Sequence, residues 1–295
     1  MWRVDCRESR YWFKVNGRAR WEGAVQTVVA ALAPEYVHGP VAEERSRGWT
    51  LTRDSGPLLR TALESSARVE VEALAPMLAD YARLQRRTLG YRDLFASAGI
   101  PKALAAVPDA AAEAQAFHLA GLSANDPRRI TEAQYDHVLS ALPALREAAK
   151  VLVEGPVPMA LDQGDLWPGN IGCPVDGGSF RFFDFADASW SHPFGSLAMM
   201  VVECVYRWEV PQPADAVNLR EERTREVIDT YLREWTDFAP IEDLRELAGY
   251  ALRVAPLNRA AAWIRNLEDA GPDDLDRYGR MPWAWLEDVT KPVFI

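Results

Sequence analysis

Two carboxylates and an amide lie close together in one polar stretch of the chain. Asp165 follows Gly164, Asn170 comes after a Trp-Pro-Gly turn, and Asp184 follows a Gly-Gly turn. A carboxylate can orient an attacking hydroxyl and accept its proton. An amide and a second carboxylate offer the hard oxygen ligands that Mg²⁺ takes from proteins, with phosphate and water completing its shell. This order of residues predicts a site for metal-assisted phosphoryl transfer, with Asp165 facing the acceptor hydroxyl.

The residues between these side chains predict how the chain brings them together. Residues 167–169 form a compact turn that returns Asn170 towards Asp165. Residues 175–179 predict a hairpin turn, whose flanking strands would set Asp184 beside Asn170. Either Asp alone would be explained more simply as the cap of a turn or loop. The set of three within one short window favours a nucleotide–metal site.

This stretch resembles the motifs of the aminoglycoside phosphotransferase family. The segments QGDLWPGN and FFDFAD carry the resemblance, which extends over most of the chain. It implies a two-lobed, protein-kinase-like α+β fold, with ATP and Mg²⁺ as cofactors. The acceptor would be a hydroxyl of a small molecule, an aminoglycoside-like antibiotic or a metabolite. The resemblance also implies that Asp165 is the catalytic base and that Asn170 and Asp184 bind Mg²⁺.

The same resemblance implies a nucleotide site near the N-terminus. Lys14 would bind the phosphates, Glu22 would pair with this lysine, and backbone groups around Thr52, Arg53 and Asp54 would hold the adenine. The residues support the pair, because Lys14 lies in an apolar strand and Glu22 lies within reach at the start of the next helix. An exposed lysine on an edge strand and a glutamate favoured by the helix dipole remain the alternative.

Hydrophobic patterning predicts the small lobe that would position these residues. Aromatic and β-branched runs at residues 2–5 and 11–15 predict a hairpin. Apolar residues at helical spacing predict a helix over residues 19–32. Two short strands at residues 37–43 and 49–52 would complete a small sheet.

After a loop at residues 53–57 the pattern becomes helical, from residue 58 to residue 153 and again after the polar stretch. We predict a nucleotide-binding lobe over residues 1–55 and a helical catalytic and substrate-binding lobe over residues 56–295. Pro76 should kink or split the first of these helices, and Pro193 should begin a buried one. Further expectations are helices at residues 219–235 and 241–267, an acidic loop at 268–276 and an aromatic tail at 281–286.

The sequence departs from the family pattern at three places. Gln163 stands where the family has His, although Gln can also donate and accept hydrogen bonds. Only residues 2–5 precede the hairpin turn, so a first strand and its glycine-containing, phosphate-covering loop have no residues. Either the natural chain begins upstream of Met1, which we favour, or ATP is bound poorly. His192 and Ser196 stand where relatives often carry an Asp that braces the catalytic loop.

Other polar and aromatic residues are open to two interpretations. Asp187 is either a further acidic group near the metal or a loop residue. The acidic segment 268–276 either lines a rim for a cationic acceptor or, as we favour, is a solvated loop. Trp263, Trp283 and Trp285 either floor an acceptor pocket or, more commonly for aromatic residues, belong to the core. We expect no catalytic role for any of the four histidines.

Composition limits the classes of function. The chain of 295 residues is 48% hydrophobic and 26% charged, as in soluble globular proteins. A net charge of −10 argues against sequence-independent nucleic-acid binding; it would suit a cationic acceptor, but solubility alone also accounts for it. Three widely separated cysteines indicate reduced thiols, and the apolar runs are too short for a membrane span. We expect a cytoplasmic protein without nucleic-acid or membrane partners, and the sequence does not indicate its oligomeric state.

Two hypotheses of function follow from these residues. The first is an ATP-dependent O-phosphotransferase that acts on a small alcohol, favoured by the intact Asp, Asn, Asp set. The second is a catalytically weak or inactive nucleotide-binding protein with a kinase-like fold, favoured by the missing loop, Gln163 and Ser196. Protein-kinase activity is a weaker third option, since no activation-loop signature follows Asp184.

Overall fold

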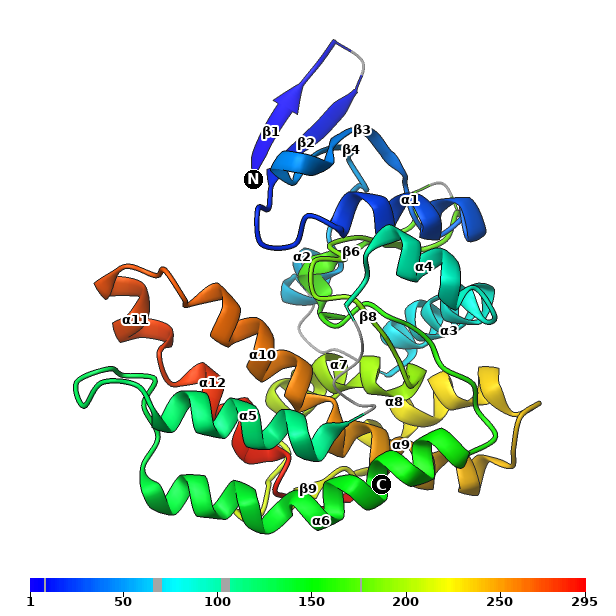
Figure 1. Ribbon diagram of the computed structural model, residues 1–295. Coiled ribbons are helices and arrows are strands. Elements are labelled where there is room, and N and C mark those ends of the chain that lie inside the picture. Colours follow the sequence, from blue (N-terminus) through cyan, green and yellow to red (C-terminus); the bar gives the residue numbers. More distant parts are fainter. Residues whose placement is uncertain (8, 66–70, 102–106, 176) are drawn as a thin grey trace.

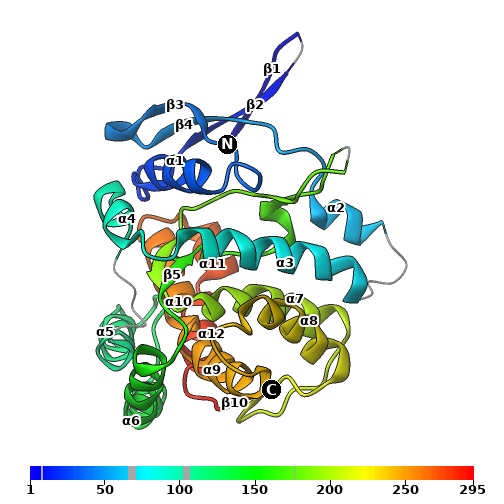
Figure 2. The same cartoon turned by 90° about the vertical axis from the view of Figure 1, so that its right-hand side faces the viewer.

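The chain folds into a small β-rich lobe and a larger helical lobe, the α+β architecture that the sequence predicts (Figure 1, Figure 2). The computed structural model describes residues 1–7, 9–65, 71–101, 107–175 and 177–295. Positions 8, 66–70, 102–106 and 176, which belong to a predicted turn, the predicted helical stretch and the predicted hairpin, lie outside the described residues.

The small lobe is an antiparallel sheet with one helix beside it. The strands pair in the order β1-β2-β4-β3, with bounds β1 (Trp2–Asp5), β2 (Arg10–Val15), β3 (Pro40–Glu44) and β4 (Trp49–Arg53). The predicted hairpin is confirmed, since Trp2 pairs with Phe13. Helix α1 (Glu22–Leu32) begins later than residue 19, because the Asn16 side chain accepts the Ala19 N–H at 3.2 Å and holds a turn there.

In the described part of the large lobe, helices predominate and three short strand pairs lie between them. The helices are α2 (Leu59–Glu64), α3 (Val71–Thr88), α4 (Arg92–Ala98), α5 (Pro108–Ala120), α6 (Glu132–Glu154), α7 (Leu197–Arg207), α8 (Glu222–Leu232), α9 (Ile241–Val254), α10 (Pro256–Asn266), α11 (Pro272–Tyr278) and α12 (Met281–Asp288). The strand pairs are β5 (Ala160–Asp162) with β8 (Ser189–Ser191), β6 (Ile171–Gly172) with β7 (Arg181–Phe182), and β9 (Val217–Asn218) with β10 (Val293–Phe294).

Three predictions of secondary structure need correction. Of the kink or split expected at Pro76, the split does not occur, and the kink stays a prediction: Pro76 lies on the exposed side of continuous helix α3, where water can reach the carbonyl group that lacks an N–H partner. The predicted acidic loop contains α11, because Pro272 and the two Asp residues after it suit a helix N-terminus. The helix expected from Pro193 begins with a 3-10 turn, η4 (Pro193–Ser196), before α7.

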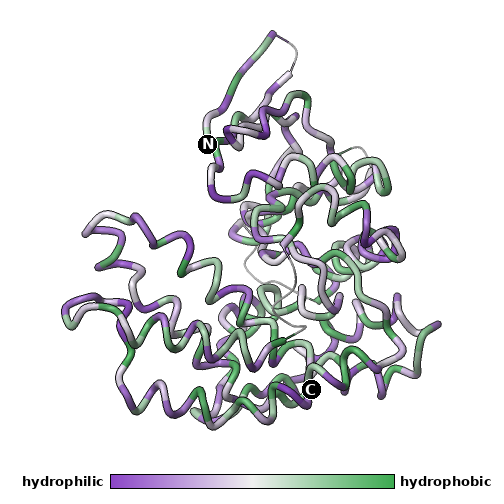
Figure 3. Tube along the Cα trace, in the orientation of Figure 1, coloured by the Kyte–Doolittle hydropathy of each residue, from purple (hydrophilic) through white to green (hydrophobic). Residues whose placement is uncertain are grey.

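An aromatic core lies between the central helices of the large lobe. Tyr81 of α3 meets Phe182 at a ring-centroid distance of 5.1 Å, and Phe194 meets Tyr231 of α8 at 5.8 Å and Trp235 at 5.6 Å. In Figure 3 the green hydrophobic colour is concentrated in this central region, whereas α11 is mainly purple. This rigid base supports the strands that carry the polar stretch. Within the described ranges, every helix is too short or too polar to cross a bilayer.

Arg18, on the loop between β2 and α1, ties the small lobe to the C-terminal end of α10. Its Nη1 donates to the carbonyl oxygens of Arg265 and Asn266 at 2.9 and 2.8 Å, and its Nη2 donates to Asp269 at 2.8 Å. The last carbonyl groups of a helix need such donors, so Arg18 caps α10 from the other lobe.

Candidate active site

A cavity of about 390 Å³ lies between the two lobes. It contains all the residues for which the sequence predicts contact with nucleotide or metal. These are Lys14, Glu22, Thr52, Arg53, Asp54, Asn170 and Asp184. The small lobe supplies β2, α1 and the end of β4, and the polar stretch, more than 100 residues further along the chain, supplies the other side of the cleft.

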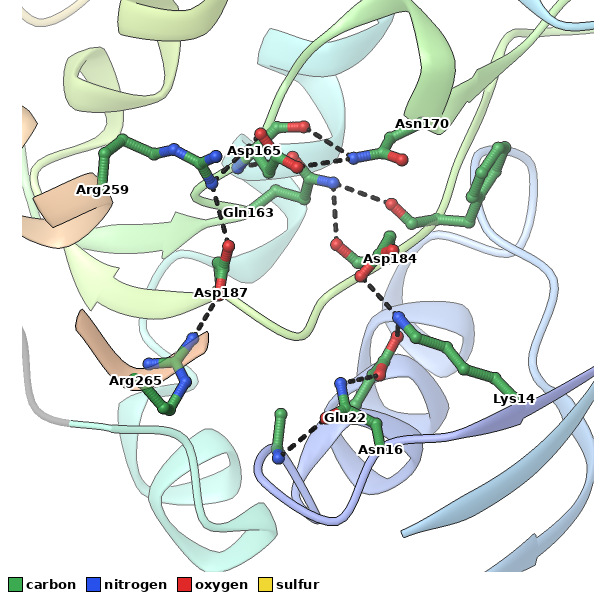
Figure 4. A network of polar contacts seen from close by, with 12 residues as sticks. Lys14, Asn16, Glu22, Gln163, Asp165, Asn170, Asp184, Asp187, Arg259 and Arg265 are labelled. Carbon is green, nitrogen blue, oxygen red and sulfur yellow. Dashed lines mark hydrogen bonds and ion pairs between the residues drawn. The ribbon is translucent and has the colours of Figure 1, made fainter. Parts of the chain in front are cut away.

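Lys14 joins the small lobe to the polar stretch. Its Nζ donates to Glu22 Oε1 and to Asp184 Oδ1, each at 2.7 Å, and Asn16 Nδ2 donates to Glu22 Oε2 at 3.1 Å (Figure 4). Burial disfavours the ammonium charge, but the carboxylates of Asp184 and Glu22 outweigh this effect, so the pKa of Lys14 is raised. Lys14 therefore stays charged at the edge of the cavity.

Gln163 joins the backbone at Asp165 to the backbone at Asp184 within the polar stretch. Its Nε2 donates to the carbonyl oxygens of Phe183 at 2.7 Å and Asp184 at 2.9 Å, and its Oε1 accepts the Asp165 N–H at 3.1 Å. Asp184 has a left-handed backbone with φ of 60°, which is costly for a residue other than Gly and needs such support. The Gln amide thus preserves the local geometry despite the departure from His.

Asp165 and Asn170 are held against each other by the short turn between them. Asn170 Nδ2 donates to the Asp165 carbonyl oxygen at 3.0 Å and to Asp165 Oδ2 at 3.1 Å. Burial raises the pKa of Asp165 to about 6, although the Arg259 charge opposes this effect. Asp165 is thus oriented on one side by an amide that also lines the cavity.

Arg259 and Arg265, both from α10, were not predicted from the sequence. Arg259 Nη1 lies 3.1 Å from Asp165 Oδ1 and 2.9 Å from Asp187 Oδ2, and Arg265 Nη2 contacts Asp187 Oδ1. The Arg259 guanidinium also lies over the Trp285 ring, 5.9 Å from its centroid. Asp187 is therefore the shared partner of two arginines.

A buried polar network supports the strand before Gln163. Asp162 Oδ1 accepts the Gly164 N–H at 2.8 Å and the Ser196 hydroxyl at 2.6 Å, and Tyr81 donates to Ser196 Oγ at 2.9 Å. Burial raises the pKa of Asp162. Ser196 stands at the start of α7, where relatives often carry an Asp. In this chain the carboxylate beside Ser196 comes instead from Asp162 on β5.

We expect Ser196→Ala to lower the free energy of unfolding by about 1–3 kcal/mol, because buried Asp162 and Tyr81 each lose a hydrogen-bond partner. Urea unfolding followed by circular dichroism measures this change. Ser140→Ala, which removes an exposed hydroxyl on α6, is the matched control and should change stability by less than about 0.5 kcal/mol. Equal stabilities of the two variants would contradict the bracing role.

The oxygen atoms around Asn170 and Asp184 suit Mg²⁺. Asn170 uses its Nδ2 on Asp165, so its Oδ1 is left without a protein partner among the described residues. Asp184 uses Oδ1 on Lys14, and no partner of its Oδ2 is found in the described part of the chain. Both residues line the cavity, so a hard amide oxygen and a hard carboxylate oxygen are available there.

The chain was compared with known proteins by sequence and by structure. No protein-family model matches it, and no curated protein matches it in sequence. Solved structures are similar over nearly the whole chain. An ethanolamine kinase from Plasmodium vivax is 13% identical, with a TM-score of 0.62, covering 95% of this chain and 76% of that one. A choline/ethanolamine kinase family protein from Mesorhizobium loti is 14% identical, with a TM-score of 0.59, covering 95% and 82%.

The GDP complex of aminoglycoside 2'-phosphotransferase-IIIa is likewise similar, with 17% identity and a TM-score of 0.55 over 94% of this chain and 86% of that one. Identities this low establish the fold and leave activity open. At the level of the fold, the resemblance read from the motifs is confirmed: this chain has the two-lobed, kinase-like fold of the ethanolamine kinases and aminoglycoside phosphotransferases.

Proposed function

We propose that this protein is an ATP- and Mg²⁺-dependent O-phosphotransferase whose acceptor is a small molecule with a hydroxyl group. The observation that carries the proposal is the meeting of Lys14, Asn170 and Asp184 at the cleft between the lobes, with Asp165 hydrogen-bonded to Asn170. The neighbouring structures, which are small-molecule phosphotransferases, support the same class of reaction.

In this proposal the small lobe and the end of β4 hold the nucleotide. Backbone groups from Thr52 to Asp54 contact the base, and Lys14 binds the phosphates while Glu22 keeps it in place. A bound Mg²⁺, held by Asn170 and Asp184, would neutralise phosphate charge. The GDP bound in a neighbouring structure supports a purine nucleotide site, and ATP is the nucleotide we propose.

Asp165 orients the acceptor hydroxyl and accepts its proton as the reaction proceeds. The acceptor oxygen forms a bond to the γ-phosphorus, and the bond from that phosphorus to the bridging oxygen breaks. The products are a phosphate monoester and ADP, with the proton on the Asp165 carboxylate. Lys14 stabilises charge on the departing phosphates, and Gln163 keeps Asp165 and Asp184 in register.

A second candidate function is nucleotide binding without efficient transfer. One specific contact favours it, because the Arg259–Asp165 ion pair engages the carboxylate that should act as the base. A guanidinium group held there would stabilise the ionised Asp165 carboxylate, but it would also compete with the acceptor hydroxyl for that carboxylate.

One experiment separates these two functions. The melting temperature is measured with ATP and with GTP, each with and without Mg²⁺, while nucleoside diphosphate release is followed against a panel of hydroxyl compounds. The panel contains matched anionic, neutral and cationic members: glucuronate, glucose and glucosamine, and glycerate, glycerol and 2-amino-1,3-propanediol, alongside choline and kanamycin. We expect Mg²⁺-dependent stabilisation and acceptor-dependent diphosphate release. Stabilisation by nucleotide without diphosphate release would favour the binding function. The absence of both stabilisation and release would contradict both functions.

A further inference from the structure

We propose that the acceptor of this chain carries an oxyanion, a carboxylate or a phosphate group, which binds to Arg259 and Arg265 beside the base. This inference rests on the proposed phosphotransferase function and names the class of its substrate. It runs against the cationic acceptor that the acidic composition would suit.

The two arginines lie on the side of Asp165 that faces away from the nucleotide cavity. In Figure 4, Asp165 stands between Asn170 and Arg259, and only Asn170 lines the cavity. An acceptor whose hydroxyl is in line with the nucleotide must approach Asp165 from the other side. The groups that it meets there are the guanidinium groups of Arg259 and Arg265.

Some N–H donors of these two guanidinium groups have no partner among the described residues. Arg259 makes its contacts with Asp165, Asp187 and the Gly164 carbonyl oxygen all through Nη1, at 3.1, 2.9 and 3.3 Å. Its buried Nε has no partner among the described residues, although the side chain is only 11% exposed. Arg265 reaches Asp187 through Nη2 and is 29% exposed. Arg259 Nε is enclosed by the protein, but Arg259 Nη2 and the other donors of Arg265 also have no partner among the described residues, and a planar oxyanion satisfies guanidinium donors two at a time.

Hydrogen-bonding capacity also favours an anion. The carboxylates of Asp165 and Asp187 are already matched by two guanidinium groups. The cluster is neutral, so net charge favours neither sign of ligand. An ammonium group, however, has only donors and would leave the unused guanidinium donors without a partner, whereas an oxyanion accepts from them. Of the two acidic residues just after α10, Asp269 is engaged by Arg18 at 2.8 Å and Glu268 is exposed to solvent. The overall charge of −10 therefore does not describe this part of the cleft.

An oxyanion bound here would also change the surroundings of the base. Arg259 would share its charge between Asp187 and the ligand, which weakens its hold on Asp165. Asp165 would then be released towards the hydroxyl of the same molecule. Binding of an acceptor with an oxyanion would thereby weaken the Arg259–Asp165 ion pair, which is the contact that favours nucleotide binding without transfer.

The proposal is tested first by oxyanion binding, which does not depend on turnover. The melting temperature of the intact protein is measured against increasing inorganic phosphate or malonate, with chloride keeping the ionic strength constant. The two arms distinguish a phosphate from a carboxylate preference. Ligands that bind the folded state raise its stability with concentration. We expect such a rise in the wild type, and an affinity lower by about tenfold or more in Arg265→Gln.

Arg277→Gln, an exposed arginine of α11 with the same change of charge, is the matched control and should behave as the wild type. The same three proteins are then assayed on the matched anionic, neutral and cationic acceptors. If the wild type turned over the anionic acceptors faster than the neutral and cationic ones, and Arg265→Gln lost this preference, the result would support the proposal. An equal anion response in wild type and Arg265→Gln would overturn the proposal, as would turnover of a cationic member that Arg265→Gln leaves unchanged. An Arg265-dependent anion response without any turnover would uphold the oxyanion site and contradict the phosphotransferase function, so the two failures are distinguishable.

Discussion

Asp165→Asn should lower kcat by about 10²- to 10⁴-fold, the range that a positioned general base contributes. Asn has the same shape and can still accept hydrogen bonds, but it cannot take the proton of the acceptor hydroxyl. Nucleotide binding should remain, because Lys14 and Asp184 are unchanged and Asp165 does not line the nucleotide cavity. The measurement is steady-state release of ADP, with the melting temperature recorded for the same samples.

Asp274→Asn is the matched control for this variant. Asp274 lies on the exposed first turn of α11, so the same chemical change there should leave kcat and stability close to those of the wild type. Full turnover by Asp165→Asn would refute the role of Asp165. A loss of turnover accompanied by an equal loss of folded protein would also fail to support it, since the effect would then be one of stability.

Asp184→Asn should abolish the response of nucleotide binding to Mg²⁺ and lower kcat by about 10²-fold or more, since a metal ion contributes several kcal/mol of charge stabilisation. Asn tolerates the left-handed backbone that Asp184 adopts, with φ of 60°. The substitution therefore removes the carboxylate without adding backbone strain. It also leaves Lys14 with Glu22 as its remaining anionic partner.

Melting temperatures with ATP, with and without Mg²⁺, measure the first effect, and ADP release measures the second. Asp136→Asn, an exposed residue of α6, should retain the Mg²⁺ response. If Asp184→Asn kept a Mg²⁺ response of wild-type size, the assignment of Asp184 as a metal ligand would be wrong. A fall in stability without nucleotide would instead point to the Lys14 contact as the main role of this carboxylate.

The parts of the site that could be predicted are those encoded by short-range spacing. Asp165 and Asn170 are separated by one tight turn, and a hairpin carries the chain from Asn170 to Asp184. Lys14 and Glu22 lie on consecutive elements and meet at 2.7 Å. In such segments the local backbone almost determines which side chains can meet, so residue type and order carry the information.

Arg259 and Arg265 could not be found in this way. Arginines on an amphipathic helix usually face solvent, and nothing in the local sequence marks these two as different. Their contacts with Asp165 and Asp187 depend on where α10 packs against the loop after Asp184, which is a property of the whole large lobe. Asp162 did leave a signal, because a carboxylate in an apolar strand needs a partner. Its partner Ser196, on another element, appears only in the folded chain.

Arg18 connects the small lobe to the end of α10 that carries Arg265. If the small lobe swings away to let nucleotide leave, either three hydrogen bonds at the end of α10 break or this end of the helix moves with the lobe. The end of α10 carries Arg265, and through Asp187 it is connected to Arg259. In the proposed reaction, the second of these outcomes would couple departure of the nucleoside diphosphate to loosening of the Arg265 contacts around the phosphorylated product. The order in which the two products leave would then depend on Arg18, an arginine outside the cavity.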